Sequence, residues 1–265
     1  MTEIPTFEVN AFVGPGLSGN PAAVCLLDHG LEDEAMLAIA KRHNLSETAF
    51  LVAAGPGDDF DYHLRWFTPE VEVDLCGHAT LATAHVLFNE RGFEGREVRF
   101  LSPSGLLSAR SEGQLIWLDF PSRKPLAATL PAAVLKAIGG APKEVLLGQR
   151  DYLLVYGDQA EVEALGPDFE TLGDHGLLGY IATASGRQVD FVSRCFFPAY
   201  GIDEDPVTGS AHCVSGPYWA EKLGRNDIKA HQISPRGGEL ALRIVDDRTL
   251  IGGRAETVRR GEIQV

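Results

Sequence analysis

The sequence contains no hydrophobic run that approaches the ~20 residues needed to cross a lipid bilayer as a helix. Its first five residues also lack the basic and apolar regions of a secretory signal peptide. Positive charge is scarce, because 23 Lys and Arg residues stand against 37 Asp and Glu residues, for a net charge of -14. Such a surface repels phosphate backbones and anionic lipids. We therefore expect a cytoplasmic protein that binds neither nucleic acid nor membranes.

Cysteine is rare as well. The four cysteines are Cys25, Cys76, Cys195 and Cys213. They form no C-x-x-C pair, which argues against a disulfide framework and against a zinc finger. His78 and His85 lie seven residues apart within one expected helix, so their side chains would be two turns apart, too far to share one metal ion. The sequence therefore predicts no metal site.

Hydrophobic patterning divides the 265 residues into alternating strands and helices. Strands are predicted at 7–13, 22–27, 60–66, 97–101, 106–110, 114–120, 152–156, 180–184 and 189–197, with a further strand near Val145. Helices are predicted at 32–44, 79–90, 131–138, 159–165 and 211–219. The helices at 79–90 and 211–219 carry almost no charge between their ends, so we expect both to be buried on nearly all sides.

A repeated pattern indicates two related halves. Residues 65–69 (RWFTP), a loop and then Gly77-His78-Ala79 open the first buried helix. Residues 194–198 (RCFFP), a longer loop and then Gly209-Ser210-Ala211 open the second. We expect two domains, residues 1–122 and 123–265, each a curved sheet around a central helix. The last strand of the chain could pair back onto the first domain.

The starts of these two buried helices are the predicted binding residues. A helix N-terminus presents unpaired N–H groups and partial positive charge, which suit a carboxylate. Taken singly, Ser210 could be only a helix cap and His78 only a polar residue at a helix start. Two such starts in related halves favour a binding role. If the halves face each other, the two sites would converge on one cleft.

Two carboxylates are candidates for the chemistry. Glu47 lies in the apolar run 45–52. It either faces solvent at a sheet edge or is partly buried, and burial suits general acid/base work. Asp205 belongs to the acidic cluster 203–205 just before the second buried helix. It either stabilises that helix from a solvated loop or orients the catalytic groups.

Two other patterns carry less weight. Residues 14–19 (GPGLSG) match G-x-G-x-x-G, but the strand that follows Asn20-Pro21 leaves no helix to receive a pyrophosphate, so we interpret them as a surface turn. Ser210, His78 and Asp205 are the residue types of a hydrolase triad. The nucleophile-elbow pattern G-x-S-x-G is absent around Ser210, which disfavours that enzyme class.

Taken together, these motifs resemble the phenazine biosynthesis PhzF-like isomerase family, which shares its fold with diaminopimelate epimerase and proline racemase. The resemblance spans nearly the whole chain and rests on the following segments: Asn10-Ala11-Phe12, Gly19-Asn20-Pro21, residues 44–48 (NLSET), Phe67-Thr68-Pro69, residues 76–80 (CGHAT), residues 197–201 (FPAYG) and residues 204–211 (EDPVTGSA).

The resemblance implies an α+β fold of two similar domains, each a barrel-like, mostly antiparallel sheet wrapped around a buried helix. It implies a site without cofactor or metal and a homodimer. Glu47 would be the proton-shuttling acid/base, with His78, Asp205 and Ser210 holding the substrate and tuning Glu47. The residues expected to line the substrate site are Cys76, Gly77, Ala79, Gly209 and Ala211.

We therefore predict an isomerase that shifts a proton on a small amino-acid-like or cyclic carboxylate by acid/base catalysis. One alternative is a small-anion-binding protein of the same fold without turnover. Another is a cysteine-dependent racemase or epimerase, since related racemases place one cysteine at each buried-helix start. Cys76 has such a position, but no cysteine stands near Thr208, and Cys213 lies a full turn inside its helix. This disfavours the racemase and favours a structural role for Cys76.

Overall fold

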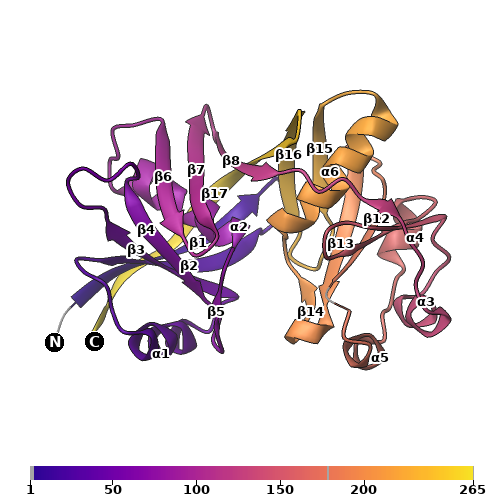
Figure 1. Cartoon of the computed structure of the whole chain (residues 1–265), viewed down its shortest axis with the longest axis horizontal. Coiled ribbons are helices and arrows are strands. Elements are labelled where there is room, and N and C mark those ends of the chain that lie inside the picture. Colours follow the sequence, from indigo (N-terminus) through magenta and orange to yellow (C-terminus); the bar gives the residue numbers. More distant parts are fainter. Residues whose placement is uncertain (1–2, 178, 265) are drawn as a thin grey trace. The chain divides into compact units, whose positions relative to one another are not determined.

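The computed structural model describes residues 3–177 and 179–264. The chain divides into two compact units, Met1–Asp119 with Gly252–Val265, and Phe120–Ile251 (Figure 1). Within the described residues, every helix is too short or too polar to cross a lipid bilayer.

The first unit is built on a closed barrel. Its strands are β1 (Glu3–Val13), β2 (Asn20–Leu27), β3 (Glu47–Ala53), β4 (Tyr62–Phe67), β6 (Glu97–Ser102), β7 (Gly105–Glu112), β8 (Leu115–Pro121) and β17 (Arg248–Gln264). Each strand from β1 to β8 in this series pairs with the next. β17 closes the ring by pairing with both β8 and β1. The short strand β5 (Glu72–Val73) pairs with β4.

Two helices pack on opposite sides of this barrel wall. Helix α2 (Gly77–His85) runs on into a π-helical turn, η1 (Val86–Glu90). It packs against β1, β2, β3 and β7, and every residue from 78 to 84 is buried, which confirms the burial expected from its lack of charge. Helix α1 (Asp33–His43) covers another face, where Met36 and Ile39 share an apolar cluster with Phe50 and Phe67.

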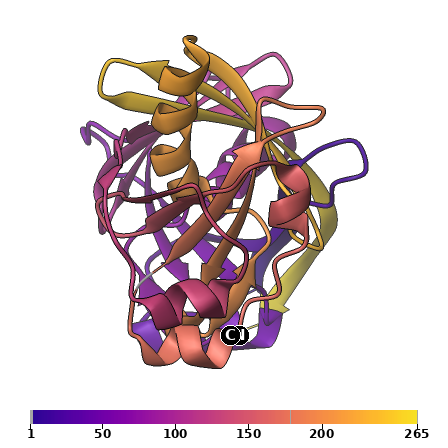
Figure 2. The ribbon, with the colours of Figure 1, turned by 90° about the vertical axis from the view of Figure 1, so that its right-hand side faces the viewer.

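The second unit repeats this order of elements. Its strands are β9 (Leu126–Ala127), β10 (Glu144–Leu147), β11 (Tyr152–Val155), β12 (Tyr180–Ser185), β13 (Phe191–Phe197), β14 (Ile202–Asp205), β15 (Asp227–Gln232) and β16 (Gly238–Val245). Its helices are α3 (Ala132–Ile138), α4 (Gln159–Glu163), α5 (Phe169–Asp174), η2 (Pro198–Tyr200) and α6 (Gly209–Leu223). Helix α6 packs against β12, β15 and β16 and is the upright orange helix of Figure 2.

Strand directions show that the two units share one topology. In the first unit, β1–β2, β3–β4 and β6–β7 are antiparallel, whereas β2–β3 and β4–β6 are parallel. In the second unit, β10–β11, β12–β13 and β15–β16 are antiparallel, whereas β11–β12 and β13–β15 are parallel. Helix α6 follows β14 as α2 follows β5. These directions confirm the α+β fold of two related halves.

One side-chain arrangement recurs in both units. Arg65 of β4 donates from Nε and Nη2 to the two carboxylate oxygens of Glu72 in β5, at 2.6 Å each. Arg194 of β13 donates in the same way to Glu204 in β14, at 2.8 and 2.9 Å. Each guanidinium also lies over the phenylalanine ring two residues later in its strand, at 5.2 and 5.1 Å from the ring centre. The repeated motif of the sequence therefore marks a repeated contact.

Candidate active site

Glu47 is the first residue of β3, where it lies opposite Ala22 of the parallel strand β2. Successive side chains of a strand point to opposite faces, so Glu47 shares a face with Ala49 and Leu51, both of which are buried. The Glu47 side chain is only 12% exposed. Of the two placements that the sequence allows, the structure has the partly buried one.

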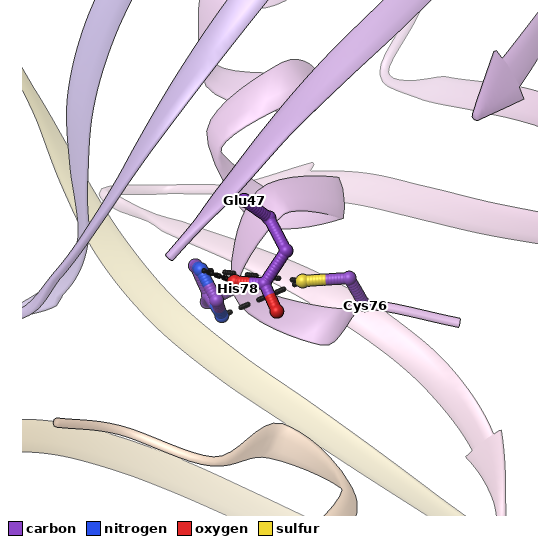
Figure 3. Close-up of side chains that lie close together, drawn as sticks. All are labelled: Glu47, Cys76 and His78. Carbon is purple, nitrogen blue, oxygen red and sulfur yellow. Dashed lines mark hydrogen bonds and ion pairs between the residues drawn. The ribbon is translucent and has the colours of Figure 1, made fainter. Parts of the chain in front are cut away.

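His78 is the partner of this carboxylate. It is the second residue of α2, and its side chain is 6% exposed. Its Nε2 atom lies 3.0 Å from Glu47 Oε2, and the two side chains point toward each other in Figure 3. The contact is an ion pair when His78 is protonated, and in it the buried carboxylate oxygen faces the imidazole Nε2. A proton can therefore lie on either of the two groups.

Cys76 completes the cluster at the start of α2. Its Sγ lies 3.5 Å from His78 Nδ1 (Figure 3). Burial, with the nearby charge of Glu47, raises the pKa of the Cys76 thiol, so the sulfur stays protonated at neutral pH. Burial alone would lower the pKa of His78, but the adjacent Glu47 carboxylate raises it above its usual value.

Two neutral residues that the sequence analysis did not single out complete the surroundings of His78. The amide Nδ2 of Asn20, at the start of β2, lies 3.3 Å from His78 Nδ1, and Asn20 is fully buried. The Ser46 hydroxyl donates to Asn20 Oδ1 at 3.3 Å. The sequence signal that could have identified Asn20 is a polar residue between Gly19 and Pro21, at the start of an apolar strand.

The types of atom in this cluster also suit metal ions. Donor atoms of Glu47, Cys76 and His78 all lie within 4.8 Å of one another. The Cys76 sulfur lies 3.5 Å from Nδ1 and 4.0 Å from Nε2, and Glu47 Oε2 lies 3.0 Å from Nε2. The short contact of Oε2 with Nε2 is that of an acid–base pair, and we assign none of the three residues as a metal ligand.

The second unit places its predicted residues around the start of α6. Asp205 ends β14 opposite Cys195 of β13, and its carboxylate accepts a hydrogen bond from the Thr208 hydroxyl. Gln232, which the sequence analysis missed, donates to the Asp205 carbonyl at 2.7 Å and accepts from the Thr208 N–H at 2.8 Å. Ser210, the second residue of α6, is half-buried. Asp205 is thus held rigidly beside the helix start.

Both helix starts are suited to receive an anion. Neither α2 nor α6 has an acidic residue in its first turn or a capping side chain among the described residues. Their first N–H groups are therefore not satisfied by a cap. The structure groups Cys76, Gly77 and Ala79 with Glu47 and His78, and it groups Gly209 and Ala211 with Asp205 and Ser210. That one substrate contacts both groups stays a prediction.

Comparison with known proteins agrees with this architecture. The family model described as phenazine biosynthesis-like protein (PhzC-PhzF) matches residues 9–261. An uncharacterized isomerase of Pseudomonas aeruginosa is 46% identical over 263 residues, which cover 99% of this chain and 100% of that protein. The crystal structure of a PhzF-family phenazine biosynthesis protein of Enterococcus faecalis is 43% identical, with a TM-score of 0.94 over the whole of both chains.

A more distant structure shows the same fold alone. A probable proline racemase of Agrobacterium radiobacter is 10% identical, with a TM-score of 0.67 over 99% of this chain and 93% of that one. The epimerase-like fold and the family predicted from the sequence are therefore confirmed. The chain belongs to the phenazine biosynthesis-like (PhzF) family and is an isomerase.

Proposed function

We propose that this isomerase shifts a proton between two atoms of a small carboxylate substrate, with Glu47 as the acid/base. The observation that carries the proposal is the contact of Glu47 with His78 inside the barrel of the first unit, 3.0 Å long and almost closed to solvent. Carboxylates in such surroundings are typical general acids and bases.

The proton transfer needs two steps. In the first, Glu47 Oε2 takes a proton from a substrate C–H bond, and the electrons of that bond move into the π-system of the substrate. In the second, the new O–H bond of Glu47 breaks and the proton joins a different atom of the substrate. A double bond of the substrate has then moved, and neither Glu47 nor the substrate has gained a net charge.

His78 supports the transfer electrostatically. The negative charge of Glu47 favours a positive charge on His78, and this coupling raises the pKa of the imidazole. When Glu47 takes up the substrate proton, the developing negative charge on the substrate replaces that of the carboxylate beside the ring. The Nε2–H group of His78 then faces the developing negative charge, and a fixed donor at that place lowers the barrier.

The helix starts would hold the substrate. Backbone N–H groups at Gly77 and Ala79 can bind a carboxylate oxygen near Glu47, and glycine allows close approach. In the second unit, we propose that the N–H groups at Gly209 and Ala211, with the Ser210 hydroxyl, bind a polar group of the substrate. Asp205, fixed by Thr208 and Gln232, would orient that group.

The test replaces Glu47 with glutamine. The wild-type protein is incubated in D₂O with a panel of small amino-acid-like and cyclic carboxylates, and deuterium uptake is followed by NMR. For any compound that exchanges, Glu47→Gln should lose at least about 100-fold in rate, because the amide cannot accept the proton. Glu70→Gln is the matched control, since Glu70 is an exposed acid of the same unit. Full exchange by the Glu47 variant would refute the proposal.

A further inference from the structure

The two ring nitrogens of His78 have different surroundings. Nε2 faces Glu47 Oε2 at 3.0 Å. Nδ1 faces the Asn20 amide nitrogen at 3.3 Å and the Cys76 sulfur at 3.5 Å. The Cys76 sulfur also lies 4.0 Å from Nε2. Nδ1 therefore has two neutral groups as its neighbours, whereas the nearest neighbour of Nε2 is the carboxylate.

Asn20 is fixed by its backbone as well as by Ser46. It lies at the start of β2 opposite Ala11 of β1. The preceding Gly19 has φ +69, and a Cβ there would lie 2.3 Å from the Ala11 carbonyl oxygen, so only glycine allows this turn. The Ser46 hydroxyl donates to Asn20 Oδ1 and so leaves the NH₂ end of the amide turned toward the ring.

Both groups that face Nδ1 are donors. An amide NH₂ can only donate, and the Cys76 thiol keeps its S–H because burial raises its pKa. A nitrogen flanked by donors has to accept, so Nδ1 carries no hydrogen and the ring proton lies on Nε2, toward Glu47. Glu47 from β3 and Cys76 from the segment before α2 are the titratable groups that act on His78 among the described residues. Asn20 and Ser46 are uncharged.

We propose that Asn20, oriented by Ser46, is a positioning residue that holds His78 in its Nε2–H form and opposes a second proton on Nδ1. Glu47 favours the charged ring and Asn20 disfavours it, and the balance keeps the proton between Glu47 and His78 mobile. The catalytic consequence rests on the proposed function, whereas the tautomer itself does not.

The experiment reads the tautomer without turnover. The protein is labelled with ¹⁵N-histidine, and the His78 ring signals are assigned with a His78→Gln variant. In the wild type at high pH, Nδ1 should show the shift of an unprotonated nitrogen and Nε2 that of a protonated one. In Asn20→Asp, the carboxylate accepts from Nδ1–H, so the His78 titration should move up by about one pH unit or more.

A second asparagine–histidine pair in the same unit supplies the control. Asn89 Nδ2 lies 3.1 Å from His85 Nδ1 on an exposed face. Asn89→Asp should alter the His85 signals and leave those of His78 unchanged. A folded Asn20→Asp protein with an unchanged His78 titration, or a wild type with the proton on Nδ1, would overturn the proposal.

Ser46→Ala keeps the inference testable if Asn20→Asp does not fold. Without the hydroxyl, the Asn20 amide can turn over, so the two His78 nitrogen shifts should move toward each other, and unchanged shifts would contradict the proposal. In D₂O exchange, Asn20→Asp should also move the pH–rate profile in the same direction as the His78 titration. If Glu47→Gln keeps full exchange while the His78 signals behave as expected, the proposed function fails and the tautomer assignment stands.

Discussion

Gly179 takes the place in the second unit that Glu47 has in the first. Phe50 lies opposite Arg65 in the first unit, and Ala182 lies opposite Arg194 in the second. Glu47 comes three residues before Phe50, and Gly179 comes three residues before Ala182. The duplication has therefore kept the fold of both halves and an acid at this position in only one of them. An acid at this position in one unit only supports the proposed proton shift by Glu47 rather than a reaction that uses two opposed bases.

Another carboxylate fills the space beside Gly179. A Cβ at this residue would lie 2.6 Å from Asp151 Oδ1 and 2.5 Å from a ring carbon of Phe197. Asp151 is fully buried and accepts two hydrogen bonds from Arg150, at 2.9 and 3.2 Å. The second unit thus keeps a carboxylate in this region, but an arginine binds it on both oxygens.

Gly179→Ala should destabilise the protein. Neither the packed ring nor the buried ion pair can move away without loss, so we expect a cost of roughly 1–3 kcal/mol in the free energy of unfolding, measured by urea denaturation. Gly166→Ala is the control in the same unit, because a Cβ at Gly166 meets no atom within 4 Å. Equal stability of the two variants would show that the region has space for a side chain.

Cys76→Ala should keep most of the proton-exchange activity. A cysteine racemase needs a second thiol at the start of α6, and that position holds Thr208, whose hydroxyl donates to Asp205. The four cysteines are also buried, and burial raises the pKa of Cys213 to about 12. Alkylation of the folded protein should therefore be slow. Loss of exchange in Cys76→Ala, comparable with that in Glu47→Gln, would restore the racemase alternative.

The sequence predicted well the features that depend on local pattern. The near absence of charge between the ends of 79–90 predicted a buried helix, and the structure has α2 and η1 there, with residues 78–84 buried and Asn89 exposed. Glu47 and His78 were both chosen from sequence, but their contact depends on the parallel register of β2 and β3, which no local pattern records.

Other features were predicted only in outline or not at all. We expected that the last strand could pair back onto the first domain, and β17 pairs with β1, but its bounds could not be given because most of its side chains beyond residue 253 are not buried and leave no continuous apolar signal. Asn20 and Gln232 were missed for a different reason. Neutral amides have no distinctive chemistry in a sequence, and their roles come from the groups that the fold brings to them.

The two arginine–glutamate contacts should differ in their importance for stability. Arg194 and Glu204 are 13% and 12% exposed, against 34% and 30% for Arg65 and Glu72. Removing Arg194 leaves a nearly buried carboxylate unpaired, so Arg194→Met should cost roughly 3 kcal/mol. Arg65→Met should cost about 1 kcal/mol or less. Urea denaturation of both variants checks the order, and a larger cost for Arg65→Met would contradict it.

Acid should destabilise the folded protein through His212. This side chain is fully buried in α6, where it contacts the Thr208 carbonyl at 2.8 Å, and burial lowers its pKa from 6.5 to about 4. Above pH 6.5 both the folded and the unfolded chain hold a neutral His212. Between pH 6.5 and 4 the unfolded chain binds a proton that the folded chain does not, so stability falls with pH, by about 3 kcal/mol in total, and levels off below pH 4.

The measurement that isolates this effect is the pH dependence of the free energy of unfolding in His212→Asn. The raised pKa of His78 acts with the opposite sign, since protonation then favours the folded state, so the wild type alone shows a mixture of the two effects. The difference between the wild type and His212→Asn removes the contribution of His78, which both proteins share. His175→Asn, at an exposed histidine of the same unit, should follow the wild-type slope. If His212→Asn also follows it, His212 is not the group that binds the extra proton on unfolding.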